Sequence, residues 1–138
     1  MAVSSVTHLN FRGDARAALE FYRSVFDGEL VVITNGDMGV PGDPEQVKWG
    51  QVVAPNGFHV MAYDVPADQP WSRGDDSFFL SLRGDDADEI SALWAKLVEG
   101  ATVRAPLEPA PWAPLYGMLT DRFGVTWVLD VAVQYTPA

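Results

Sequence analysis

One pattern of apolar and polar positions occurs twice in the chain. Residues 9–31 and 80–103 each contain alternating apolar residues, an Arg-Gly-Asp turn, a stretch with apolar residues every three or four positions, a glycine, and the start of a further alternating stretch. Alternation with a period of two is typical of a strand, and the wider spacing is typical of an amphipathic helix. A repeat of this length predicts two copies of one structural unit.

The first copy predicts one helix among four strands. Its expected elements are, in order, strand 3–11, helix 15–26 with Asp14 as N-cap, strand 29–34, loop 35–45, strand 47–54 and strand 58–64. Apolar side chains at helical spacing predict the buried stripe of the helix: Ala18, Leu19, Tyr22, Val25 and Phe26. Alternation in the last strand places His59, Met61 and Tyr63 on one face and Phe58, Val60 and Ala62 on the other.

The second copy predicts the same order of elements. They are strand 77–82, helix 87–98, a short strand from Val103, an irregular loop over 104–114, strand 115–120 and strand 125–133. The loop is expected because the segment carries four prolines. Ile90, Leu93, Trp94 and Leu97 form the expected buried stripe of the helix. We therefore expect one domain over residues 1–138, with module one at about 3–64, a linker at about 65–76 and module two at about 77–133.

Composition narrows the class of protein. Nine Lys and Arg against nineteen Asp and Glu give a net charge of −10, which disfavours nucleic-acid binding. An acidic surface either attracts a cationic ligand or only confers solubility. There is no apolar run long enough to span a membrane and no signal peptide, so a cytoplasmic location is expected. The chain has no Cys, so it has neither disulfides nor thiolate metal sites.

Three segments carry a resemblance to a known family. They are LNFRGDARAALEFYRSVFDGE near the start, the second-copy strand and helix, and PWAPLYGMLTDRFGVTWVLD near the end. With paired βαβββ modules, they resemble the PhnB-like branch of the vicinal oxygen chelate superfamily, which includes glyoxalases, extradiol dioxygenases and bleomycin-resistance proteins. The resemblance implies an α+β fold in which the modules form a curved, cup-shaped mixed sheet with helices outside and a ligand pocket inside. It also implies a homodimer.

Metal-dependent members of the superfamily bind a divalent ion through His, Glu or Gln on the first and last strands of each module. Carried onto this chain, the four positions fall on His8, Phe79, Met61 and Val128. Of these, His8 alone is a typical ligand, and one imidazole does not hold a catalytic ion. A weaker alternative is a shifted set of His8, His59 and Asp130. We therefore expect no metal cofactor, with a divalent ion as the less favoured alternative.

The same resemblance implies residues that line the pocket. The expected ligand-binding residues are His8, Asn10, His59, Met61, Tyr63, Phe79, Val128 and Asp130, with Trp112 and Tyr116 near the mouth. Asp130 is a candidate general base with His8 as its partner. The simpler interpretation of His8 is a pocket histidine that hydrogen-bonds a ligand or a neighbouring carboxylate. Those of the other residues are a half-exposed His59, an Asp130 that meets water at the strand end, and a Trp112 that only packs its loop on the sheet.

Three functions remain open from the sequence. The first is binding of a small organic ligand without a catalytic metal. The second is an enzyme, either a metal-dependent lyase, isomerase or dioxygenase or a metal-free catalyst that uses His8 and Asp130. The third is a structural or interaction domain, which a cup filled by its own side chains would favour.

Overall fold

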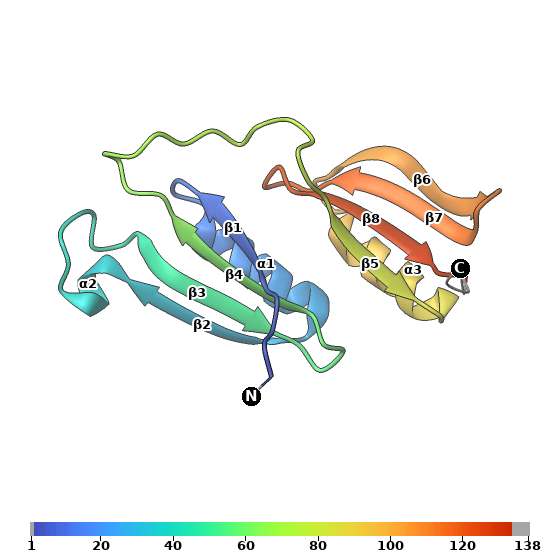
Figure 1. The fold of residues 1–138 in the computed structure, drawn as a ribbon, viewed down its shortest axis with the longest axis horizontal. Coiled ribbons are helices and arrows are strands. Elements are labelled where there is room, and N and C mark those ends of the chain that lie inside the picture. The colour runs from blue at the N-terminus through green and yellow to red at the C-terminus, as the bar shows by residue number, and fades with distance from the viewer. Residues whose placement is uncertain (1, 134–138) are drawn as a thin grey trace. The chain divides into compact units, whose positions relative to one another are not determined.

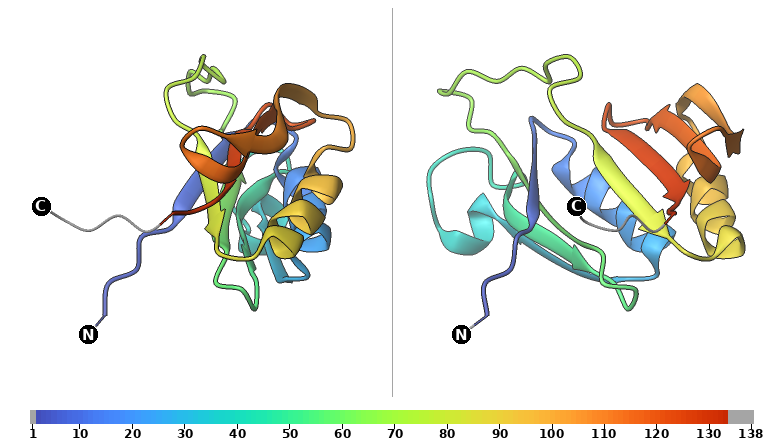
Figure 2. Two further views of the ribbon diagram at one scale, coloured as in Figure 1. Left: turned by 90° about the vertical axis from the view of Figure 1, so that its right-hand side faces the viewer. Right: turned by 45° about the vertical axis from the view of Figure 1, so that its right-hand side comes forward.

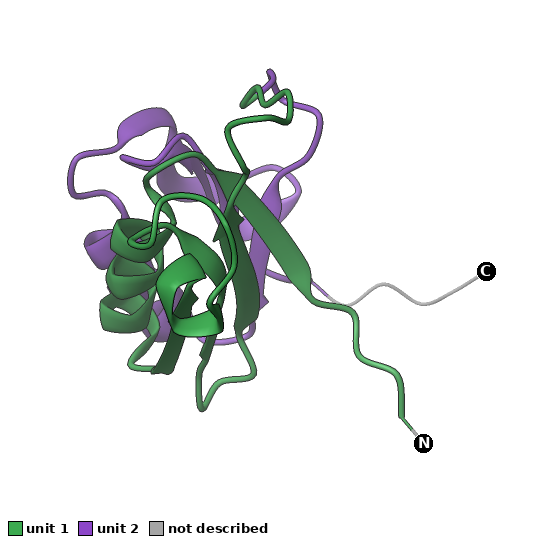
Figure 3. Ribbon diagram, turned by 90° about the vertical axis from the view of Figure 1, so that its left-hand side faces the viewer, with its two compact units in different colours: residues 1–73 green, residues 74–138 purple. Residues whose placement is uncertain are grey.

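The computed structural model describes residues 2–133. Residue contacts divide the chain into two compact units, unit 1 (residues 1–73) and unit 2 (residues 74–138) (Figure 3). The boundary falls inside the predicted linker at 65–76. The single domain stays a prediction.

Unit 1 is a four-stranded mixed sheet with one long helix on one face (Figure 1). Its elements are β1 (Thr7–Phe11), α1 (Ala15–Phe26), β2 (Glu29–Thr34), α2 (Asn35–Met38), β3 (Val47–Val53) and β4 (His59–Asp64). The strand order is β1-β4-β3-β2, in which β1 pairs parallel to β4 and the other neighbours are antiparallel.

Unit 2 repeats this topology. Its elements are β5 (Leu80–Gly84), α3 (Ala87–Leu97), β6 (Thr102–Ala110), β7 (Ala113–Thr120) and β8 (Thr126–Val131). The order β5-β8-β7-β6, with β5 parallel to β8, matches that of unit 1 element for element. The predicted α+β fold of two βαβββ modules is confirmed.

Each unit has its core between the helix and the sheet beneath it (Figure 2). In α1 all five predicted stripe residues are buried, because an apolar stripe at helical spacing must face the sheet. In α3 Ile90 and Leu97 are buried, but Leu93 and Trp94 are only half-buried. Trp127 of β8 is fully buried, as expected for a core residue.

The predicted loop over 104–114 is wrong, since most of it belongs to strand β6. Pro106 and Pro109 lie inside this strand. The strand tolerates them because β6 is at the edge of its sheet and its register with β7 shifts repeatedly, so it needs fewer backbone N–H groups for pairing. Proline here marks an edge strand of the sheet and not a break between two strands.

Other differences are local. Strand β1 begins at Thr7 rather than residue 3, and β5 runs over Leu80–Gly84 rather than 77–82. The predicted loop 35–45 contains the one-turn helix α2, which begins with a capping box between Thr34 and Asp37.

The Arg-Gly-Asp turns of the two copies differ in detail. Asp14 is the N-cap of α1 but makes no side-chain capping hydrogen bond, whereas Asp86, not Asp85, caps α3. Gly13 has a positive φ of 107° and lies in a turn, whereas Gly84 ends strand β5. The turn of the second copy is therefore displaced by one residue toward the helix.

A close contact in unit 2 gives the first prediction. A Cβ at Gly117 of β7 would lie 2.8 Å from Cζ3 of Trp94 and 3.0 Å from the backbone Cα of Leu107. The backbone atom cannot rotate away, so Gly117→Ala is expected to lower the free energy of unfolding by about 1–3 kcal/mol. Urea unfolding measures this loss. Gly84→Ala is the control, because its nearest neighbours, Ile90 side-chain atoms, would lie 3.4 Å away. Equal losses in the two variants would contradict the packing argument.

Within residues 2–133, no helix combines the length and the apolar character needed to cross a membrane.

Candidate functional site

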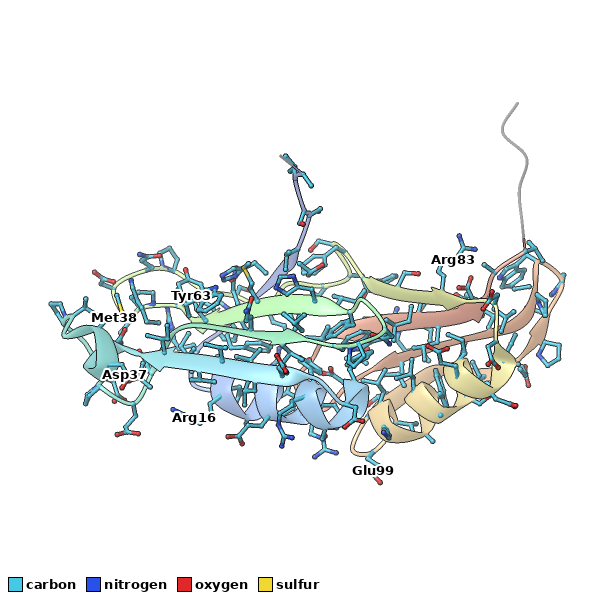
Figure 4. The ribbon with its side chains drawn as sticks, turned by 90° about the horizontal axis from the view of Figure 1, so that it is seen from below. Arg16, Asp37, Met38, Tyr63, Arg83 and Glu99 are labelled. Atoms are coloured by element: carbon cyan, nitrogen blue, oxygen red, sulfur yellow. The ribbon has the colours of Figure 1, made fainter. Side chains whose placement is uncertain are left out.

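Each sheet has one face on the side opposite its helix, here called the helix-free face. Figure 4 shows Tyr63 of β4 and Arg83 of β5 on the sides of their own sheets that point away from α1 and α3. Alternation along each strand assigns the remaining side chains to this face or to the core.

The helix-free face of unit 1 collects polar and aromatic side chains. His8, Met61 and Gln51 are direct neighbours across β1, β4 and β3, and Asn10 lies opposite Tyr63. On β4, His59, Met61 and Tyr63 are half-buried and alternate with buried core residues, which confirms the predicted alternation. Unit 1 thus brings together five predicted site residues: His8, Asn10, His59, Met61 and Tyr63.

His8 is held in a defined orientation. Its Nδ1 lies 2.8 Å from Oδ1 of Asn10, and its ring meets Tyr63 edge-on with centroids 5.2 Å apart. An amide oxygen can only accept, so Nδ1 donates this hydrogen bond and Nε2 remains for a ligand. Asn10 is held in turn, because Trp71 Nε1 donates to its backbone oxygen at 3.1 Å. The partner of His8 is therefore an amide and not the ligand or carboxylate of the simpler interpretation.

His59 is oriented by a residue that the sequence analysis missed. Its Nε2 lies 2.8 Å from Oε1 of Gln51 on the neighbouring strand β3. Alternation along β3 was the available signal, since Gln51 lies between two core positions, Gly50 and Val52.

The metal site of the superfamily does not fit these residues. Phe79 and Val128 have no lone pair to donate, and Met61 offers only a thioether. His8 keeps one ring nitrogen, Nε2, but one imidazole does not hold a catalytic ion. Within residues 2–133, no three His, Asp or Glu side chains are grouped so that they could hold a metal ion.

The helix-free face of unit 2 carries a polar row across all four strands. Arg83, Asp130, Tyr116 and Glu108 are successive neighbours on β5, β8, β7 and β6. Asp130 accepts from Nε of Arg83 at 3.1 Å, and its side chain is 10% exposed against 52% for Arg83. The repeat places Arg83 in an Arg-Gly-Asp turn, so this ion pair was not predicted. Within unit 2, Arg83 and not a histidine is the partner of Asp130.

The aromatic candidates of unit 2 fall into two places. Trp112 lies in the β6–β7 turn and meets Tyr116 edge-on, with ring centroids 5.2 Å apart. Phe79 lies just before β5, where the guanidinium of Arg104 is 5.6 Å from its ring centroid. Arg104 also pairs with Asp76, and its hydrogen bonds lower the pKa of the Asp76 carboxyl. Phe79 thus lies against the Arg104–Asp76 ion pair.

The chain is similar to a protein-family model and to several solved structures. The model of the Glyoxalase/Bleomycin resistance protein/Dioxygenase superfamily matches residues 5–129. Protein PA1353 from Pseudomonas aeruginosa is similar in structure, with 32% identity, a TM-score of 0.86 and coverage of 95% of this chain and 98% of that one.

Two further solved structures are similar. One is the Bacillus cereus PhnB protein, described as a putative 3-demethylubiquinone-9 3-methyltransferase, with 29% identity, a TM-score of 0.78 and coverage of 94% and 100%. A glyoxylase/bleomycin resistance protein/dioxygenase domain from Frankia sp. EAN1pec has 15% identity, a TM-score of 0.68 and coverage of 96% and 99%, and shares the fold. No curated protein matches the chain.

Proposed function

Because the chain belongs to the glyoxalase/bleomycin resistance protein/dioxygenase superfamily, we propose that it binds a small organic ligand on a helix-free sheet face without a catalytic metal ion. The observation that carries this proposal is the fixed His8 on that face of unit 1. Its ring is oriented by Asn10 and Tyr63, and Nε2 remains for a hydrogen bond with a ligand. Polar groups placed in this way among aromatic and apolar side chains are typical of small-molecule sites.

The chemistry of the donor set supports the metal-free form of the proposal. Of the four positions that carry ligands in metal-dependent members, Phe79 and Val128 cannot coordinate an ion. The alternative enzyme, a metal-dependent lyase, isomerase or dioxygenase, would need ligands from other positions.

Thermal unfolding with a library of small organic molecules tests the proposal. At least one molecule is expected to raise the unfolding temperature, because a ligand that binds only the folded state stabilises it by mass action. The shift should be unchanged by EDTA. His8→Ala should weaken binding by about fivefold, which is the loss of roughly one hydrogen bond.

Arg16→Ala is the matched control for this experiment, because Arg16 is exposed on α1, on the other side of the sheet. A shift that EDTA removes, or one that His8→Ala and Arg16→Ala reduce equally, would contradict the proposal. The homodimer and the cytoplasmic location stay predictions, and light scattering of the purified protein tests the first.

A further inference from the structure

We propose that the helix-free face of unit 2 binds an aromatic carboxylate, with Arg83 as the group that holds the carboxylate and the Trp112–Tyr116 pair as the surface for the ring. This inference goes beyond the proposed function, because its site lies on the helix-free face of unit 2 and not at His8 of unit 1.

Arg83 differs from the other arginines in the described part of unit 2. Arg104 donates from both Nη atoms to Asp76, at 2.7 and 2.9 Å. Arg122 donates from Nε and Nη2 to the backbone oxygen of Glu99. Arg83 instead pairs with Asp130 through Nε. A guanidinium has five N–H donors, so both Nη groups of Arg83 remain for a further acceptor.

Asp130 fixes the direction of this guanidinium. Its carboxylate is almost buried in β8 and holds Nε, while the side chain of Arg83 is half exposed on the helix-free face (Figure 4). An arginine anchored through Nε presents its planar Nη pair, which matches the two oxygens of a carboxylate. Because the anchor is already in place, less side-chain freedom is lost when a ligand binds.

The aromatic pair lies within reach of the same ligand. Tyr116 is the direct neighbour of Asp130 on β7, on the side opposite Arg83. Two strand spacings of about 4.8 Å separate the backbones of Arg83 and Tyr116, so one small molecule can span them. Trp112, at 56% exposure, meets Tyr116 edge-on and leaves aromatic surface available for a flat ring.

The charge of Glu108 sets the sign of one control experiment. Glu108 lies beside Tyr116 at the far end, and its carboxylate opposes an anionic ligand. Glu108→Gln should therefore raise the affinity for a carboxylate. The net charge of −10 opposes anions over longer distances, but at 0.15 M salt the Debye length is about 8 Å and distant charges are screened.

Calorimetric titration with 2-naphthoate and its neutral amide, 2-naphthamide, tests the inference at 0.15 M salt. The protein should bind the carboxylate at least about tenfold more tightly than the amide, as expected for charge-assisted hydrogen bonds. Arg83→Gln should remove this preference and Arg83→Lys should keep only part of it. Arg104→Gln should leave it unchanged.

The double variant Arg83→Gln/Asp130→Asn keeps a neutral hydrogen-bonding pair, so it tests the charge even if the single variant unfolds. Retained preference for the carboxylate in this variant would overturn the inference. Equal affinity for naphthoate and naphthamide would also overturn it while leaving the proposed function standing, as would inorganic phosphate competing as strongly as naphthoate. If neither naphthyl compound binds and no library molecule stabilises the protein, both proposals fail.

Discussion

Replacing Asp64 with Ala is expected to lower the free energy of unfolding by about 3–5 kcal/mol, because it leaves buried N–H donors without an acceptor. Asp64 ends β4 and is buried. One oxygen accepts from the backbone N–H groups of Gly13 at 2.6 Å and Ala15 at 3.2 Å, and the other accepts from Val47 at 3.0 Å. One side chain therefore joins the start of α1, the end of β4 and the start of β3.

Urea unfolding followed by far-UV circular dichroism measures this loss. Asp64→Asn is expected to fall between the Ala variant and the original protein, since it keeps one acceptor oxygen. Asp68→Ala is the control, because Asp68 is exposed in the segment after β4 and should change stability by less than about 0.5 kcal/mol. A loss below about 1 kcal/mol in Asp64→Ala would show that the three hydrogen bonds do not organise unit 1.

Asp121→Ala is expected to have an effect of similar size in unit 2, about 3–5 kcal/mol. Asp121 is buried in the turn between β7 and β8. It accepts from the backbone of Phe123 at 2.8 Å and Val125 at 3.1 Å, and from Nε1 of the buried Trp127 at 2.9 Å. The variant leaves these donors without this acceptor inside the core of unit 2.

The environment of Trp127 provides the specific readout for this variant. Near-UV circular dichroism and tryptophan emission should change in Asp121→Ala at urea concentrations where the original protein is folded. Asp85→Ala, an exposed position before α3, is the matched control and should leave both signals unchanged. A stable Asp121→Ala protein with an unaltered tryptophan signal would contradict the assigned role.

The fold was predictable where local patterns and the repeat agreed. Helix α1 has the predicted bounds because its apolar stripe and its glycine stop coincide. Strand β6 was missed because the prolines suggest a break, and only the strand order shows that β6 is an edge strand. Asp64 was not predicted as a buried acceptor, because its donors come from elements that fold next to it only in three dimensions. The donors to Asp121 lie within six residues of it, but the segment was predicted only as a turn between two strands.

The candidate site was predictable to a similar extent. Alternation placed His59, Met61 and Tyr63 on one face, and parallel pairing brought His8 beside them. The Arg83–Asp130 pair was missed because it depends on the register between β5 and β8, which are far apart in the sequence. A displacement of one residue would have moved either side chain to the other face of the sheet.

The central claim, that ligand binding needs no metal ion, is tested most directly by titrating metal-stripped, tag-free protein with a stabilising ligand and following tryptophan fluorescence. The same titration is repeated after separate dialysis against Zn, Ni, Mn and Fe(II), with bound metal measured in each sample. We expect one dissociation constant in all samples. Near-stoichiometric retention of one ion, with ligand quenching that appears only when that ion is bound, would contradict the claim.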